Sequence, residues 1–562
     1  MEVQGTESAV TRSPTYAREA GRTARPRAWK AGLVLALIVT SSTLITIAAS
    51  TRTSTTFDEI VLMAGGARGW ETGEWDIAPE HPPLMQYIYG LPIHLAQPAY
   101  PAGTVAPERG DDFSFRYTYS REFFFTTGND PERMAMLGRL PGALLVGLLV
   151  LAAWGFARRF GAAAGVAAAG LVAFLPDVLA HGGVAYNDLP LALGWLLAVW
   201  ALDNAVRKPT PLAGALAGLA VAFSLGVKFS AVMLGPLAFV LIVAESLVQG
   251  RDAKWWRALG IAVACGLVAG YTGLVGIYRG DFALTEFFYG LDYTFGHVSS
   301  GHSAPGYLMG ELSPDGWWYY FPLVFLYKTP AALHILLLAG VAGLAKALGR
   351  PTLRSIAGAR LRAPVIGALV FGAALVTSNL NIGFRYALPV LPLVAIIATV
   401  GVVALWRDGS RVLRGALAVL AIWFAGSTLA FYPHFLAYTS EYGAGADNGH
   451  MLLADSSLDW GQGLLDLREW MDEQAVDNVY LSYFGSAVPA GYGIRYVPMP
   501  SMFALPPFGP PPVTPPRYAV IAATNLNGVY MTGDPFARFR AMQPDTVIAR
   551  TLLVYRIDEP GN

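Results

Sequence analysis

Long apolar segments constrain this chain more than any other feature of its sequence. About eleven runs are long enough to cross the roughly 30 Å hydrocarbon core of a bilayer as helices. The 562 residues are 54% hydrophobic and 14% charged, whereas a soluble domain carries about 25% charged residues. We therefore predict an all-α polytopic membrane bundle of about eleven transmembrane helices. Its expected spans are residues 31–50, 137–157, 162–180, 188–204, 212–227, 230–249, 256–278, 318–345, 364–378, 386–406 and 415–432.

The N-terminus is a basic tail of residues 1–30, followed by the first apolar run. A cleaved signal peptide has an apolar region of only about 7–15 residues. Because residues 31–50 form a longer run, we expect a retained first helix.

Basic residues in alternate short loops orient the bundle. The positive-inside rule places these loops and the basic tail in the cytoplasm. The opposite loops, including the long ones at residues 51–136 and 279–317, are then extracytoplasmic. We expect a multi-pass protein of the plasma (inner) membrane. The basic clusters are Arg158/Arg159, Arg207/Lys208, Arg251/Lys254/Arg257, Lys346/Arg350/Arg354/Arg360/Arg362 and Arg407/Arg411/Arg414.

The stretch at residues 433–562 has a different composition. It contains strand-like runs, a more helical segment at 461–473 and a proline-rich linker at 498–516. These features predict a small extracytoplasmic α/β domain after the transmembrane part, residues 31–432. The strand-like runs are residues 478–484, 518–523 and 551–557.

Composition also limits the classes of partner and cofactor that we expect. The formal net charge is zero, which gives no case for a nucleic-acid partner. The single cysteine, Cys265, excludes a disulfide framework and a cysteine-based metal site, and we interpret it as a buried helix thiol. No organic cofactor is expected.

Acids and histidines gather in the predicted extracytoplasmic loops. Asp58 and Glu59 follow the first helix, where adjacent carboxylates can hold an acceptor's hydroxyl or amine and take its proton; a solvated loop start is the alternative. Further on, Pro82 and Pro83 would present Glu80 and His81 at a helix start. This pair can bind a divalent metal, or His81 can steer a phosphate.

Two further groups lie on the same predicted side. His297 and His302 stand in a Gly/Ser-rich stretch of the second loop, which suggests a loop that closes on a substrate. The cations Lys228, Lys328 and Arg385 lie at outer helix ends, against the positive-inside bias. Pairing with a lipid phosphate would explain them, and so would snorkelling or a structural ion pair.

Three short motifs resemble the GT-C superfamily of lipid-dependent glycosyltransferases. The resemblance is to the protein O-mannosyltransferase-like group, which includes the bacterial transferase that puts aminoarabinose on lipid A. His-Pro-Pro-Leu matches the mannosyltransferases, and the preceding Glu matches the aminoarabinose transferase, which has Lys where His81 stands. The resemblance covers roughly residues 31–432. Its motifs are Asp58-Glu59, Glu80-His81-Pro82-Pro83-Leu84 and Gly383-Phe384-Arg385-Tyr386.

The resemblance implies a GT-C fold and an inverting transfer from a polyprenyl-phosphate sugar. Asp58 would be the general base on the acceptor, with Glu59 assisting or positioning. Glu80, together with a histidine of the second loop, would hold the divalent metal (Mg²⁺, Mn²⁺ or Zn²⁺) that many relatives need and others do not. The implied donor-phosphate residues are His81, Lys228, Lys328 and Arg385, and the implied substrate-binding residues are His297, His302 and Tyr386.

The C-terminal segments 453–462 and 481–485 are similar to the tail of uncharacterised bacterial members. Sugar binding and simple packing both remain open for Asp455, Asp459, Trp460 and Gln462. The chain lacks the sugar-binding insert of the eukaryotic mannosyltransferases, and its tail differs from that of the lipid A enzyme. The acceptor, whether protein, lipid or glycan, is therefore open.

Two other functions compete with a membrane glycosyltransferase. A transporter or flippase of a lipid-linked sugar also needs charged residues in a helix bundle, but transporters tend to place them near the midplane, often with inverted repeats. Here the charges sit at one face, beside a long loop. A non-catalytic assembly subunit is the third reading, and the intact Asp58-Glu59 pair argues against it.

Overall fold

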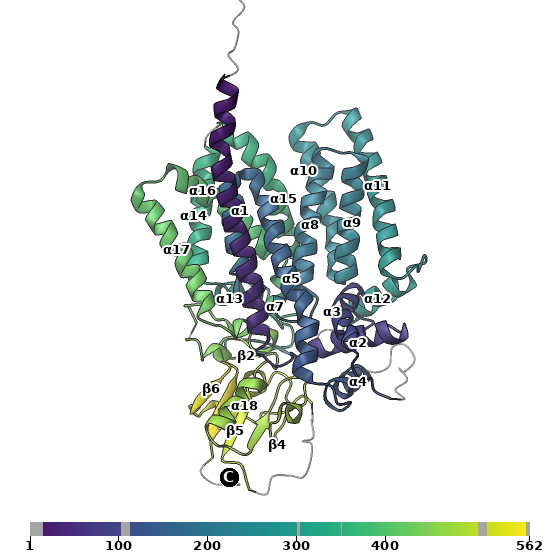
Figure 1. Cartoon of the computed structure of the whole chain (residues 1–562), viewed down its shortest axis with the longest axis vertical. Coiled ribbons are helices and arrows are strands. Elements are labelled where there is room, and N and C mark those ends of the chain that lie inside the picture. The colour runs from purple at the N-terminus through teal and green to yellow at the C-terminus, as the bar shows by residue number, and fades with distance from the viewer. Residues whose placement is uncertain are drawn as a thin grey trace, which may run out of the picture.

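The computed structural model describes residues 15–102, 113–299, 304–349, 351–443, 445–503 and 514–557. A bundle of long helices stands above a smaller region that contains a sheet (Figure 1). Each predicted apolar run is helical. The bundle helices are α1 (Thr15–Ser50), α5 (Pro131–Ala157), α6 (Ala162–Ala173), α7 (Pro176–Gly182), α8 (Asp188–Arg207), α9 (Pro211–Val227), α10 (Leu234–Gln249), α11 (Ala253–Ile277), α13 (Tyr320–Lys328), α14 (Ala331–Leu348), α15 (Pro351–Val376), α16 (Leu391–Asp408) and α17 (Arg411–Leu429).

Two of the predicted spans are broken. The axis bends by 63° between α6 and α7, and by 111° between α13 and α14. Pro176 and Pro330 stand at these breaks, where proline cannot continue the hydrogen bonding of the preceding helix. Among the described residues, seven helices are long and apolar enough to cross a membrane, or nine if each bent pair is one span. The predicted multi-pass helical bundle is confirmed.

Small residues bring α9 and α11 into close contact. A Cβ atom added at Gly218 of α9 would lie 2.0 Å from the carbonyl oxygen of Gly266 in α11, and one at Gly214 would lie 1.9 Å from the carbonyl oxygen of Ala262. This is the small-residue interface typical of membrane helices. It sets the position of the end of α9, which Lys228 follows directly.

The two long loops contain structure of their own. The first holds α2 (Glu59–Thr72), α3 (Leu84–Leu95) and α4 (Phe113–Phe125), and the second holds α12 (Thr285–Ser299) and the hairpin of β1 (Gly306–Leu308) and β2 (Glu311–Ser313). The loop helices pack beside the lower end of the bundle (Figure 1). Helix α3 starts directly after Pro83, so Glu80 and His81 precede a helix as predicted.

The C-terminal sheet has five strands in the order β4-β3-β5-β7-β6. The inner strand β3 pairs in parallel with β4 and β5, whereas β7 runs antiparallel to β5 and β6. The short strands β4 and β6 were not predicted. The elements are β3 (Val479–Ser482), β4 (Tyr496–Pro498), β5 (Tyr518–Ala522), β6 (Thr546–Ile548), β7 (Leu552–Arg556) and α18 (Leu464–Glu473).

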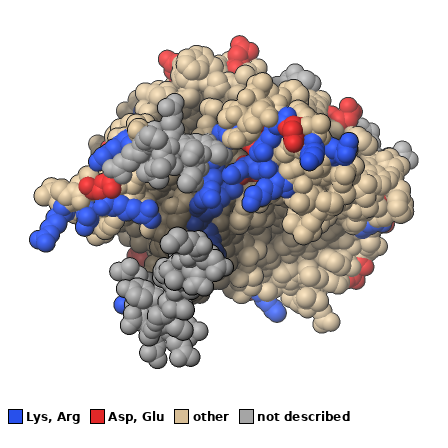
Figure 2. All heavy atoms as spheres, turned by 90° about the horizontal axis from the view of Figure 1, so that it is seen from above, with Lys and Arg blue, Asp and Glu red and all other residues tan. Residues whose placement is uncertain are grey.

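The opposite end of the bundle is basic. Seen from that end, Lys and Arg side chains form a band across the surface (Figure 2). Buried acids pair with basic residues at this end: Arg159, in the short helix η1 (Arg158–Phe160) after α5, pairs with Asp203 of α8 at 2.6 Å, and Arg362 of α15 pairs with Glu245 of α10 at 3.0 Å. The bundle therefore has one basic end and one end covered by loop helices and the sheet.

Candidate active site

Asp58 lies at the sheet-bearing end of the bundle, directly before α2. Its side chain does not cap that helix; instead, Oδ1 accepts a hydrogen bond of 2.9 Å from the hydroxyl of Tyr117 in α4. The Asp58 side chain is 22% exposed. Burial and the Asp58 carboxylate raise the pKa of Tyr117 well above its usual value, so this hydroxyl keeps its proton. The Asp58 carboxylate is thus held by the Tyr117 hydroxyl and is still partly exposed.

Glu59 points in another direction and is fully buried. Its two oxygens accept hydrogen bonds from Arg139 of α5, at 2.6 and 2.8 Å. The backbone N–H groups of Thr56 and Ala185 donate to the same carboxylate, each at 2.9 Å. The two adjacent acids therefore do not act as a pair on one ligand. Of the two roles predicted for Glu59, this geometry favours positioning over direct catalysis.

Arg385 and Lys228 meet at a shared acid, Asp188, at the start of α8. Lys228 Nζ lies 2.5 Å from Asp188 Oδ1, and Arg385 Nη1 lies 3.5 Å from Oδ2. The other Arg385 nitrogen, Nη2, is 3.7 Å from Asp58 Oδ2. Both Arg385 contacts are longer than a usual charge-assisted hydrogen bond of about 2.7–2.9 Å. The Arg385 guanidinium is therefore near two acids without a short ion pair to either.

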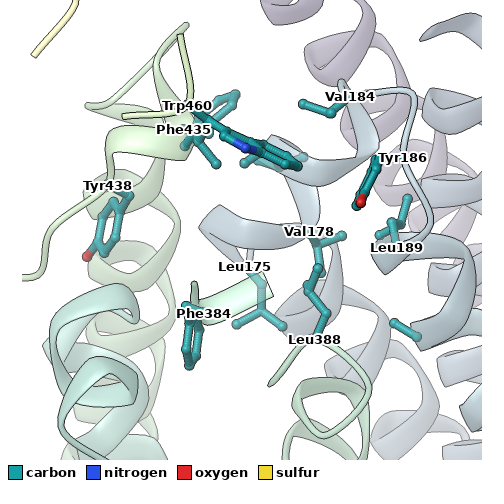
Figure 3. Close-up of a cluster of buried hydrophobic side chains, with 14 of the residues drawn as sticks. Leu175, Val178, Val184, Tyr186, Leu189, Phe384, Leu388, Phe435, Tyr438 and Trp460 are labelled. Carbon is teal, nitrogen blue, oxygen red and sulfur yellow. The ribbon is translucent and has the colours of Figure 1, made fainter. Parts of the chain in front are cut away.

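Aromatic rings enclose these cations. The Arg385 guanidinium lies 4.4 Å from the ring centre of Trp460 and 5.0 Å from those of Tyr186 and Tyr386. Lys228 Nζ is 4.6 Å from the Tyr386 ring centre. Trp460 and Tyr186 both belong to the cluster of buried side chains in Figure 3, and their rings meet edge to face. Ring faces attract cations most strongly where water is excluded, so they hold both groups in place.

His81 and Glu80 complete the same region. The His81 Nε2 atom is 3.1 Å from the Tyr186 hydroxyl. Burial, together with Lys228 and other nearby cations, lowers the pKa of His81 to about 3, so the ring is neutral. Glu80 Oε1 pairs with Arg116 of α4. Burial raises the pKa of Glu80, and Arg116 opposes this effect.

Glu80, the predicted metal ligand, has an arginine beside it in the described structure. Arg116 already occupies one oxygen of that carboxylate. No group of three or more His, Cys, Asp or Glu side chains suited to a metal occurs within the described part of the chain. The side chain of His297 and all of His302 lie outside the described residues, so their predicted contributions to metal or substrate binding stay predictions.

Lys328 does not join Lys228 and Arg385, here named the cation cluster. It is fully buried, and its Nζ donates to the carbonyl oxygens of Leu436 and Tyr438 at 2.7 and 3.0 Å. Asp177 lies 3.8 Å away on the broken span. A lysine enclosed by these acceptors has no face left for a lipid phosphate. The geometry thus favours a structural ion pair with Asp177, one of the alternatives predicted for Lys328.

The C-terminal residues considered for sugar binding are also buried. Asp455 is 6% exposed, and Asp459, Trp460 and Gln462 are 1–2% exposed. Trp460 contacts Arg385 through its ring face, whereas Gln462 bonds to the backbone of Trp460 and Leu458. Their geometry favours packing against the membrane part over direct contact with a sugar.

Several residues that build this site were not identified from the sequence. Asp188 gave a usable signal, because an acid at the start of an apolar run is costly in a membrane and is a functional hypothesis by default. Tyr186 is its near neighbour in sequence. Tyr117 and Arg139 gave no signal, because an isolated tyrosine or arginine does not reveal which distant carboxylate it contacts.

The chain is similar to known proteins in sequence and in fold. Residues 132–269 match the family model described as dolichyl-phosphate-mannose-protein mannosyltransferase. No curated protein sequence matches the chain.

Among solved structures, the chain is similar to ArnT from Cupriavidus metallidurans bound to undecaprenyl phosphate. The identity is 16% over 71% of this chain and 70% of that chain, with a TM-score of 0.46. The chain is likewise similar to the oligosaccharyltransferase of Archaeoglobus fulgidus in the apo form. The identity is 12% over 72% of this chain and 56% of that chain, with a TM-score of 0.44. The chain is also similar to the S. cerevisiae protein O-mannosyltransferase Pmt1-Pmt2 complex bound to the sugar donor. The identity is 16% over 45% of this chain and 34% of that chain, with a TM-score of 0.32.

The matched segment 132–269 contributes Arg139, Asp188 and Lys228 to the region around Asp58. The match over residues 132–269 agrees with the resemblance drawn from the motifs, that to lipid-dependent glycosyltransferases.

Proposed function

We propose that this protein transfers a sugar from a polyprenyl-phosphate carrier to an extracytoplasmic acceptor, with inversion at the anomeric carbon. One observation carries the proposal: an accessible carboxylate, Asp58, lies beside the buried Arg385 and the partly buried Lys228 at one end of a membrane bundle. Proton removal and neutralisation of a leaving phosphate are the two tasks of such a transfer.

Asp58 acts as the general base. The acceptor's oxygen or nitrogen attacks the anomeric carbon, and Asp58 takes the proton that this atom loses. The bond between the anomeric carbon and the phosphate oxygen breaks, and its electron pair goes to the phosphate. Tyr117 supports this role, because its hydroxyl donates to Oδ1 and leaves Oδ2 facing Arg385.

Arg385 and Lys228 stabilise the carrier phosphate as it leaves. The long contacts of Arg385 with Asp58 and Asp188 can be exchanged for phosphate oxygens, which a guanidinium binds with two parallel hydrogen bonds. Neutral His81 can donate one ring N–H to the same group. Tyr386 lines the site beside both cations. Glu59 and Arg139 act as positioning residues that hold the start of α2.

The experiment uses purified protein in detergent or nanodiscs with a polyprenyl-phosphate sugar and a membrane extract as the source of acceptor. Release of polyprenyl phosphate measures turnover. Asp58→Asn should lower kcat by about a hundredfold or more, the usual contribution of a general base. The matched control is Asp472→Asn, which changes an exposed aspartate of α18 and should leave turnover unchanged.

Two outcomes would contradict the proposal. If folded Asp58→Asn protein keeps full turnover, Asp58 is not the base. If the wild-type protein moves the intact lipid-linked sugar across vesicle membranes without releasing polyprenyl phosphate, the protein is a flippase rather than a transferase. Mass spectrometry of glycans and glycolipids from a deletion strain would then identify the acceptor for a transferase.

A further inference from the structure

Residues 455–462, here named the bridge segment, lie between the last membrane helix and α18. They begin with the short helix η6 (Asp455–Ser457). Although this segment belongs to the C-terminal part of the chain, its buried side chains reach the cation cluster and the backbone that leads to Asp58. Its contacts therefore concern the site itself and not only the attachment of the sheet.

On one side, the bridge segment holds Arg385. The Arg385 Nε atom donates to Ser456 Oγ at 3.1 Å, and Ser456 Oγ donates to the carbonyl oxygen of Ile382 at 3.0 Å. The N–H of Phe384 donates to Ser457 Oγ at 2.9 Å. Both serines thus bind the short turn η3 (Phe384–Ala387) that presents the guanidinium.

Gly383 shows how closely the two segments approach. Its backbone is extended, with φ at −175°, so its conformation alone does not call for glycine. A Cβ atom at this position would, however, lie 2.1 Å from Ser456 Oγ. The glycine before Arg385 therefore makes room for the serine that accepts from Arg385.

Trp460 adds a second contact with the same guanidinium. Its ring centre is 4.4 Å from the Arg385 carbon Cζ, nearer than the rings of Tyr186 and Tyr386. Trp460 also meets Tyr186 edge-to-face, with ring centres 5.4 Å apart. These rings leave the Arg385 guanidinium little freedom to turn away from Asp58 and Asp188.

On its other side, the bridge segment holds the chain ahead of Asp58. The N–H of Phe57 donates to the carbonyl oxygen of Trp460 at 2.9 Å, and the N–H of Ser54 donates to that of Gln462 at 3.1 Å. Ser54 Oγ also donates to the carbonyl oxygen of Gly461, at 3.0 Å. Trp460 thus contacts Arg385 with its ring and the residue before Asp58 with its backbone.

The sheet region makes the bridge segment rigid. Thr524, just after β5, donates its N–H to Asp459 Oδ2 at 3.0 Å and accepts from the N–H of Asp455 at 2.9 Å. Tyr530 donates to Asp455 Oδ2 at 2.5 Å. Asp455 has a positive φ of 52°, a conformation that aspartate tolerates when its side chain bonds locally, and here Asp455 Oδ1 accepts from the N–H of Ser456.

We propose that the bridge segment positions Arg385 relative to Asp58, through Ser456 and Trp460, so that the C-terminal region is a part of the active site. The inference rests on the proposed function, in which Arg385 meets the leaving phosphate. Ser456 and Trp460 are positioning residues, because they act on the reaction only through Arg385.

The first test is a double-mutant cycle between Ser456→Ala and Arg385→Lys. In the wild-type background, Ser456→Ala should lower kcat by about tenfold, since hydrogen bonds to charged groups contribute about 1.5–3 kcal/mol. The KM for the donor should change much less, because the charge on the phosphate grows in the transition state. In the Arg385→Lys background, the same change should have little further effect, because lysine lacks the Nε donor.

A second pair of variants tests the ring. Trp460→Phe keeps an aromatic face and Trp460→Leu removes it, while both side chains are smaller than tryptophan. Phenylalanine should therefore retain several-fold more kcat per folded molecule than leucine, because only phenylalanine keeps a cation–π contact with the guanidinium. A merely structural role would affect both variants alike.

Matched controls come from the same region. Ser482→Ala removes a buried serine that bonds to Pro500 and Asn525, and Trp470→Leu removes a tryptophan that contacts Tyr518. Neither residue contacts Arg385 in the described structure, and kcat per folded molecule should stay unchanged. Equal losses from Ser456→Ala in both backgrounds would overturn the positioning role.

Failure of the proposed function would look different. In that case the wild-type protein itself would not release polyprenyl phosphate. Cryo-electron microscopy of the Ser456→Ala, Trp460→Leu variant then decides the inference without any turnover. A guanidinium displaced from Asp58 and Asp188 is the expected result, and an Arg385 that keeps its place would overturn it.

Discussion

Asp58 and Glu59 are neighbours in sequence but have different surroundings. Asp58 is partly exposed and accepts from Tyr117, whereas Glu59 is fully buried and holds Arg139 with both oxygens. An isolated buried carboxylate is costly, so this ion pair and the additional backbone donors offset the cost of burying Glu59. One acid is therefore suited to take a proton and the other to fix the backbone.

Substitution by the matching amide should separate these roles. Glu59→Gln places an NH₂ group against Arg139 or a backbone N–H and breaks a buried pair, which costs about 3–5 kcal/mol. We expect a clear fall in the thermal unfolding midpoint of the purified protein. Asp58→Asn should keep its midpoint and lose turnover, because an asparagine oxygen can still accept from Tyr117.

The control for this comparison is Glu469→Gln, which changes an exposed glutamate of α18. It should alter neither the unfolding midpoint nor turnover. A Glu59→Gln protein that melts normally yet has no turnover would show that Glu59 acts directly in the chemistry.

Sequence reasoning at this scale located residues by their place along the chain, while their roles stay predictions. Asp58, His81, Lys228, Arg385 and Tyr386 were selected as residues at one face, and the structure brings them together around Asp188. Lys328 satisfied the same criterion but is enclosed by carbonyl oxygens. Its surroundings depend on residues more than a hundred positions away, which no local pattern reveals.

At the scale of elements, helix length and hydrophobicity were sufficient to locate the bundle, because a bilayer admits few alternatives. The breaks at Pro176 and Pro330 were visible in the sequence but were included in continuous spans. Of the three helices of the first loop, the start of α3 was predicted from Pro82 and Pro83, whereas α2 and α4 were not, since they are short and pack against the bundle end. Strands β4 and β6, of three residues each, carry too little pattern to recognise.

The α9–α11 interface links an element to the site. Gly218→Leu would force α9 away from Gly266, because the added Cβ meets backbone atoms that cannot rotate aside. Overpacking of this kind costs about 1–3 kcal/mol. We expect a lower unfolding midpoint and a higher KM for the lipid donor, because Lys228 follows α9 directly.

Gly260→Leu on α11 is the matched control, since a Cβ atom there meets nothing within 4 Å. Its unfolding midpoint and donor KM should equal those of the wild-type protein. If Gly218→Leu behaves like this control, the two helices do not need their close contact.

At the scale of the whole molecule, the two ends of the bundle differ in chemistry. The band of Lys and Arg side chains lies at one end (Figure 2), and the sheet and helix α2, which Asp58 directly precedes, lie at the other (Figure 1). The positive-inside rule then predicts a cytoplasmic basic end and an extracytoplasmic site. A lipid-linked donor would reach Asp58 from the outer leaflet, on the side where the acceptor is expected.

Cysteine labelling tests this orientation. The chain has a single cysteine, Cys265, so Cys265→Ser provides a background without thiols once its turnover is shown to be normal. Lys254→Cys adds a thiol to an exposed position at the basic end, and Asp472→Cys adds one to an exposed position in α18. In right-side-out vesicles, a membrane-impermeant maleimide should label Asp472→Cys and spare Lys254→Cys, because the charged reagent cannot cross the bilayer. Inside-out vesicles should give the reverse pattern, and the opposite result in both preparations would place the site in the cytoplasm.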